Sequence, residues 1–118
     1  MSASDDAQQV VDQLDELHTR LAQAWQRASN AGDYTTAKTM KSQADRAGDQ
    51  LIAARQNLLA AIDSGKDVTE LLAKMAGLSD KIKAQQQKIS DGTAVYAELS
   101  GVLDTMDQVV ALAKQIAG

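Results

Sequence analysis

The side chains that most often carry out catalysis are few in this chain, and their spacing is unsuited to it. His18 is the only histidine. Its neighbours Glu16 and Leu17 do not give the Glu-x-x-His spacing that places two metal ligands on one helix face. A nucleophile needs a general base within reach, and His18 is the only conventional base available. We therefore predict that the chain has no catalytic residue and is not an enzyme.

Pairs of acidic side chains on one helix face could instead hold a metal or transfer a proton. Three such pairs occur: Asp12 with Glu16, Asp45 with Asp49, and Asp104 with Asp107. Each pair alternates with apolar positions, as charged residues on the solvated side of a helix do. The chain also has no cysteine and no glycine-rich phosphate loop. The sequence therefore predicts neither a metal site nor a cofactor.

The charge of the chain argues against nucleic acids and membranes as partners. The formal net charge is −4, whereas contacts with phosphate groups need clustered Lys and Arg. The only basic stretch holds Lys81, Lys83 and Lys88, with no aromatic residue among them. Residues 1–19 carry five acids and neither Lys nor Arg. This asymmetry favours a protein partner, and it could orient a dimer head to tail.

The composition and the apolar pattern predict an all-α fold. The 118 residues include no proline, and good helix formers such as Ala and Leu dominate. Apolar residues recur at alternating spacings of three and four, which is the heptad pattern of packed helices. Turn residues interrupt this pattern at Gly32-Asp33, at residues 64–67 and at Asp91-Gly92. The expected helices cover about residues 4–31, 34–63, 68–90 and 94–117 of a single domain, 1–118.

Long helices with short connections favour antiparallel neighbours. We therefore expect an antiparallel up-down four-helix bundle, built from two long helical hairpins with heptad-type seams. Gly48 should lie inside one continuous helix, at a cost of about 1 kcal/mol relative to Ala. A second apolar register would carry one helix through Gly92, but we favour a break there. Gln85 interrupts the third seam and is expected near a solvated end of the bundle.

Several apolar faces are wider than a two-residue seam needs. Alanine-rich layers around the first turn remove little surface from water, so these wide faces must compensate, either within the monomer or by pairing with another chain. Trp25 lies beside the first seam, where we expect it to be buried, although an exposed Trp25 would be a binding anchor. The candidate partner-binding residues are Trp25, Ile52, Leu59, Ile62, Leu103, Val110 and Leu112.

These features favour a non-enzymatic protein–protein interaction module, such as a small adaptor, a chaperone-like subunit or an inhibitor. The expected partner is another protein, with a homodimer as one form of that binding. One alternative is a leaderless exported effector or a secretion-system component, and another is a ligand-binding or enzymatic bundle around His18 and Trp25. Neither a signal peptide nor a membrane span is recognisable in the sequence. We therefore expect a cytoplasmic protein, with leaderless secretion as the open alternative.

Overall fold

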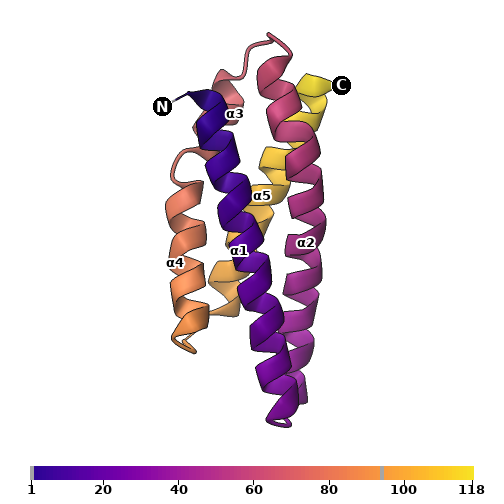
Figure 1. Cartoon of the computed structure of the whole chain (residues 1–118), viewed down its shortest axis with the longest axis vertical. Coiled ribbons are helices and arrows are strands. Elements are labelled where there is room, and N and C mark those ends of the chain that lie inside the picture. Colours follow the sequence, from indigo (N-terminus) through magenta and orange to yellow (C-terminus); the bar gives the residue numbers. More distant parts are fainter. Residues whose placement is uncertain (1, 94) are drawn as a thin grey trace.

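The computed structural model describes residues 2–93 and 95–118, and all regular elements in these residues are helices. This confirms the all-α prediction. The helices are α1 (Ala3–Asn30), α2 (Tyr34–Asp63), α3 (Thr69–Met75), α4 (Leu78–Ser90) and α5 (Tyr96–Ala117). They form an elongated molecule of 50 × 24 × 19 Å. The α1–α2 pair runs along its whole length, whereas α4 and α5 end well short of the 31–33 turn (Figure 1).

The first two helices begin at capped ends. The Ser2 hydroxyl accepts a hydrogen bond from the backbone N–H of Asp5, and the Asp5 carboxylate accepts one from the N–H of Ser2. Asp33 caps α2 through a single hydrogen bond, which its carboxylate accepts from the Thr36 N–H at 3.2 Å. Hydrogen bonds from the side chain and the backbone of Thr36 lower the pKa of the Asp33 carboxyl, because they favour its ionised form.

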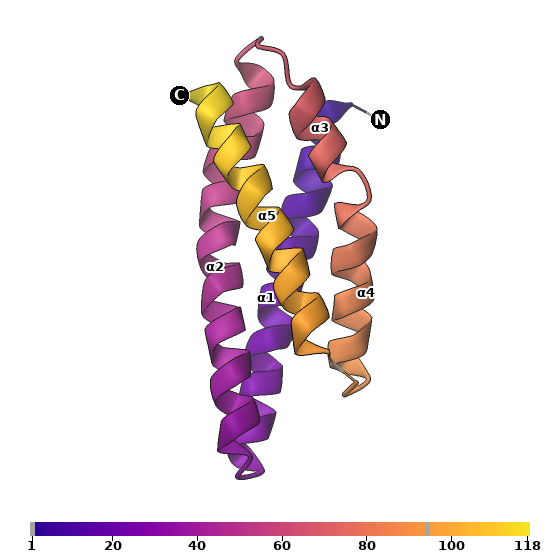
Figure 2. The same cartoon turned by 180° about the vertical axis from the view of Figure 1, so that it is seen from behind.

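The core lies between α1, α2 and α5, with α3 and α4 closing its remaining side (Figure 2). Small buried residues such as Ala44, Ala47 and Ala54 line the inner side of α2. Larger side chains from all five helices fill the centre. The largest fully buried ones are Val11, Leu14, Leu17, Leu21, Met40, Leu58, Leu71, Leu78, Ile82, Leu99, Leu103 and Met106.

The expectation of one helix over residues 68–90 is wrong. The helix breaks after Met75, where Ala76 is extended and Gly77 has a φ of +78°, a left-handed conformation that favours glycine. α4 then starts at Leu78. The apolar pattern did not reveal the break because Met75 and Leu78 are both buried, so the three-residue spacing continues across it.

The predictions for Gly48 and Gly92 are confirmed. α2 is continuous through Gly48, and α4 ends before Gly92, whose φ is +74°. The predicted start of the last helix at residue 94 lies outside the described residues, and α5 begins at Tyr96. Gln85 is not at a solvated end: it is buried, and its Nε2 donates to Glu98 Oε2 at 3.4 Å. This contact links α4 to α5, which explains a polar side chain at a seam position.

A search of the described residues found no helix with both the length and the apolar character needed to cross a membrane.

Two glycine substitutions should change the free energy of unfolding in opposite directions. Gly77→Ala forces a Cβ into the left-handed region and should cost about 1–2 kcal/mol. Gly101→Ala adds a Cβ inside α5 with no atom within 4 Å, and it should gain about 0.5–1 kcal/mol. Urea unfolding followed by circular dichroism measures both. Equal stability of the Gly77→Ala variant and the parent would contradict the break between α3 and α4.

Candidate functional site

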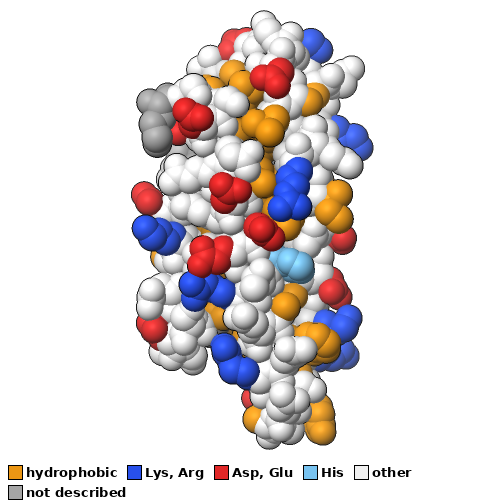
Figure 3. Space-filling view, in the orientation of Figure 1, with side chains coloured by type: hydrophobic (Ala, Val, Ile, Leu, Met, Phe, Trp, Pro, Cys, Tyr) orange, Lys and Arg blue, Asp and Glu red, His pale blue; other side chains and the backbone are white. Residues whose placement is uncertain are grey.

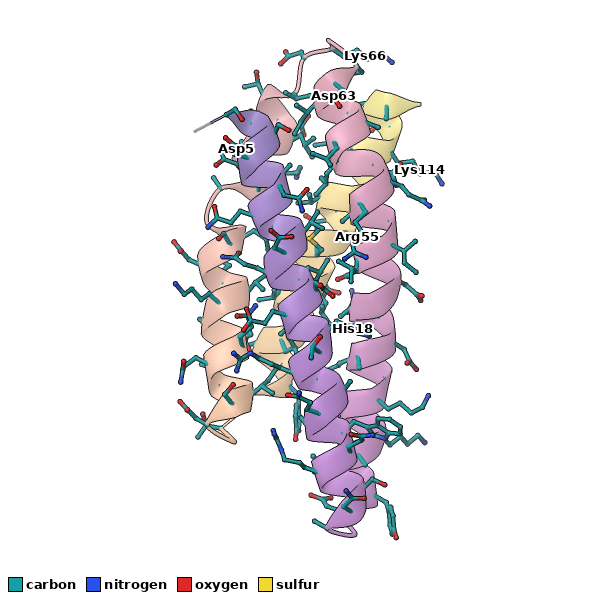
Figure 4. The ribbon with its side chains drawn as sticks, in the orientation of Figure 1. Asp5, His18, Arg55, Asp63, Lys66 and Lys114 are labelled. Atoms are coloured by element: carbon teal, nitrogen blue, oxygen red, sulfur yellow. The ribbon has the colours of Figure 1, made fainter. Side chains whose placement is uncertain are left out.

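We call the outward surfaces of α1 and α2, which face the viewer in Figure 1, the α1–α2 face. Two contacts show which residues of the two helices lie at the same level here. Arg55 Nη2 lies 3.7 Å from Asp15 Oδ2, and the ring of His18 lies against Gly48. Figure 4 shows His18 and Arg55 between the two helices. The level of each residue along the face follows from these two contacts.

The His18 ring packs closely on α2 at the position where Gly48 has no side chain. A Cβ at position 48 would lie 3.1 Å from Nε2 of His18, which is closer than side chains normally approach. Gly48 therefore leaves room for the imidazole, and its helix cost is offset by this close packing. His18 is half-buried in this contact. The described residues include no group of three or more His, Asp or Glu side chains that could hold a metal ion.

Four of the seven candidate residues lie on the α1–α2 face. Trp25 follows His18 by two helical turns and is half-buried on the same side of α1. Ile52 stands between Gly48 and Arg55 on α2, and 58% of its surface is exposed. Leu59 and Ile62 continue this side of α2, half-buried against the edge of the core. In Figure 3, apolar side chains form a broken line along this face.

The other three candidates do not join this surface. Leu103 is fully buried in the core, which corrects its assignment to a partner surface. Val110 is half-buried in a hollow between α5 and α2. Leu112 is also half-buried. It follows Val110 by two residues, and two residues along a helix turn the side-chain direction by roughly 160°. Leu112 therefore lies on the opposite flank of α5 from Val110.

A polar contact between α2 and α5 holds the inner side of α2. Gln50 Nε2 donates to the carbonyl oxygen of Leu103 and to Asp107 Oδ1, both at 2.7 Å. Arg46 Nη2 donates to Asp107 Oδ2 at 2.6 Å and also to Asp104. One turn earlier, Gln43 Nε2 donates to two acceptors on α5 at 3.3 Å. The three residues form a polar strip that we call the α2–α5 seam.

In this seam a single cation, Arg46, pairs with two carboxylates, Asp104 and Asp107. The hydrogen bond from Arg46 to Asp107 raises the pKa of the Arg46 guanidinium above its ordinary value, and the bond to Asp104 adds a smaller effect in the same direction. Asp104 and Asp107 thus join two helices, although their spacing alone suggested an ordinary solvated face. The missed signal is the spacing of Gln43, Arg46 and Gln50, which recur three and four apart on one side of α2.

A second surface feature is a hollow of about 400 Å³ between α4 and α5. Ala84, Gly101 and Val102 contribute its apolar lining, and Lys81 and Glu98 contribute charges. Lys88 and Gln85 both donate hydrogen bonds to the Glu98 carboxylate. These bonds lower the pKa of the Glu98 carboxyl, and the bond from Lys88 has the larger effect. The charged groups here thus hold α4 to α5.

Comparison with known proteins leaves the function to be argued from this geometry. No protein-family model matches the sequence. No curated protein matches it significantly, and no solved structure matches significantly.

The contact between His18 and Gly48 should be visible in a double-mutant cycle. In the His18→Ala background, Gly48→Ala should raise the free energy of unfolding by about 1 kcal/mol, the helix propensity difference. In the parent chain the gain should be smaller, because the imidazole must move by a few tenths of an ångström. Urea unfolding of the four proteins measures the coupling. Equal effects of Gly48→Ala in both backgrounds would contradict the contact.

Substitutions in the α2–α5 seam should differ in cost according to burial. Gln50 is 4% exposed, and Gln50→Ala should lower the free energy of unfolding by about 1–3 kcal/mol, the cost of losing buried hydrogen bonds. Arg46→Ala removes partly exposed ion pairs and should cost no more than about 1 kcal/mol. Thermal and urea unfolding check the order. A larger loss for Arg46→Ala would contradict it.

Proposed function

We propose that this chain is a non-enzymatic protein-interaction module that binds its partner through the α1–α2 face. The observation that carries the proposal is the exposure of Ile52 beside half-buried Leu59 and Ile62. α1 covers one side of α2 and α5 covers another, but within the described residues this strip has no helix against it. Ile52 is the exposed member of this strip, and Leu59 and Ile62 extend its apolar surface. Contiguous apolar surface of this kind is a mark of interaction sites, whereas single exposed apolar residues are common on any protein.

The character of the side chains supports a protein as the partner. Tryptophan is among the residues that contribute most to protein interfaces, and half-buried Trp25 is already held by its packing against the core. Charged residues such as Lys41 and Asp63 are exposed around the apolar strip, as in the polar rim of an interface. An adaptor, a chaperone-like subunit or an inhibitor would each use such a surface without catalysis.

The proposal also includes a finer description of the fold. In it, the chain is an antiparallel up-down four-helix bundle, and α3 and α4 together take the place of the third helix. Helices hold the face rigidly, so little conformational entropy is lost when a partner binds. The seam contacts of Gln50 and Arg46 support this rigidity, because they keep α2 in one position on α5.

Site-specific photocrosslinking in the cells that produce the protein tests this function. A photoreactive residue replacing Ile52 should form a covalent adduct with a protein, because the side chain would lie inside the bound interface. The matched control replaces Gln108, which is exposed on α5 and away from the α1–α2 face. We expect adducts at position 52 and not at position 108. Protein adducts at 108 only, or at neither position, would contradict the proposal.

A further inference from the structure

We infer that the partner of the α1–α2 face is a second copy of this chain, packed antiparallel about a two-fold axis that passes beside Ile52. This inference rests on the proposed function and adds the identity of the partner. A two-fold interface must be self-complementary: what lies on one half of the face must fit what lies on the other half. The α1–α2 face meets this requirement in apolar groups and in charge.

The apolar groups lie on either side of Ile52 at matching distances. Ile52 lies between Gly48 and Arg55, and therefore level with the part of α1 between His18 and Asp15. From there, Trp25 lies about 13 Å toward the 31–33 turn. Leu59 and Ile62 lie about 10 and 15 Å in the opposite direction. Along the long axis of the molecule, Trp25 and the half-buried pair therefore lie at similar distances on opposite sides of Ile52, as a two-fold interface requires.

The charges show the same symmetry along α2. Lys41 precedes Ile52 by eleven residues and Asp63 follows it by eleven, which is close to three helical turns in each direction. Both side chains therefore lie on the same line of α2 as Ile52, each about 16 Å from it. In the antiparallel pair, Lys41 of one copy faces Asp63 of the other. Lys41 contacts exposed Asp45 within its own chain, a surface pair that is easily exchanged.

The two halves of the face also differ in overall charge. The half next to the N-terminus carries acidic residues of α1, including Asp12 and Asp15. Figure 3 shows several acidic side chains on this half. Figure 4 places Asp5 and Asp63 at this end. The other half carries Lys38 and Lys41 on α2 together with Asp45 and Asp49, so these four charges cancel and this half is the less acidic one. An antiparallel copy brings the more acidic half against the less acidic one, whereas a parallel copy would bring the two acidic halves together.

The face is large enough for a specific dimer. The molecule measures 50 × 24 Å across its broad side, which is the side that Figure 1 shows. The α1–α2 face takes up part of this side: two adjacent helices of about 10 Å diameter over 50 Å offer roughly 1,000 Å². A specific interface buries roughly 800 Å² on each partner, which is within this area.

A single cysteine at the axis provides the first test, because the parent chain has none. A residue beside a two-fold axis meets its own copy, so Ile52→Cys should form a disulfide-linked dimer on mild oxidation. Gln108→Cys, the matched control, should stay largely uncrosslinked at the same concentration. Ile52 is mostly exposed, so the variant should fold, and circular dichroism verifies this. Equal crosslinking of the two variants, or none at position 52, would overturn the inference.

Charge reversal provides the second test, by sedimentation equilibrium over a range of protein concentrations. Lys41→Asp alone and Asp63→Lys alone should each raise the dimer dissociation constant roughly tenfold, since every dimer contains two copies of the exposed pair. The double variant should return close to the parent value. A monomer at every concentration, or a double variant weaker than either single one, would overturn the inference.

The photocrosslinking result separates this inference from the proposed function. An adduct between position 52 and this same chain supports both. An adduct with a different protein, from a chain that stays monomeric in sedimentation, supports the proposed function and overturns the second-copy inference. The absence of any adduct at position 52 overturns both.

Discussion

The hydrogen bonds between α2 and α5 determine which side of α2 remains open. Gln50 and Arg46 bind specific acceptors on α5, so moving α5 along or around α2 would leave the buried Nε2 of Gln50 unpaired and would break the ion pairs of Arg46. α1 is held on the other side by tight packing, where the ring of His18 fills the space above Gly48. With two sides occupied, the third side of α2 faces outward and exposes Ile52. The candidate binding surface is thus a consequence of how the core is closed.

Sequence periodicity predicted most of the fold because helices and turns leave local signals. The α1–α2 turn has Gly32 at a positive φ followed by the Asp33 cap, and both residue types are turn signals that the sequence itself displays. The break at Gly77 was missed for a physical reason. A left-handed glycine can interrupt a helix without shifting the apolar spacing, so Met75 and Leu78 stay buried on both sides. Only the glycine itself signals such a break.

The candidate surface was harder to predict, because flanking positions on a helix are ambiguous. Ile52 and Leu103 both lie beside a predicted seam, yet one is exposed and the other is fully buried. The difference depends on which helix lies next to each position, and that is a property of the whole fold. The same limit applies to Arg46 and Gln50. Polar side chains look like surface residues until a neighbouring helix is known to supply their acceptors.

The central claim is that a second copy of the chain covers the α1–α2 face, and Trp25 can report this directly because it is the only tryptophan. The decisive measurement is acrylamide quenching of tryptophan fluorescence while the purified protein is diluted across the range in which its mass changes. If Trp25 lies in the interface, quenching should increase and the emission should shift to longer wavelength as the assembly dissociates. Unchanged quenching across a measured change in mass would place the interface elsewhere and contradict the account.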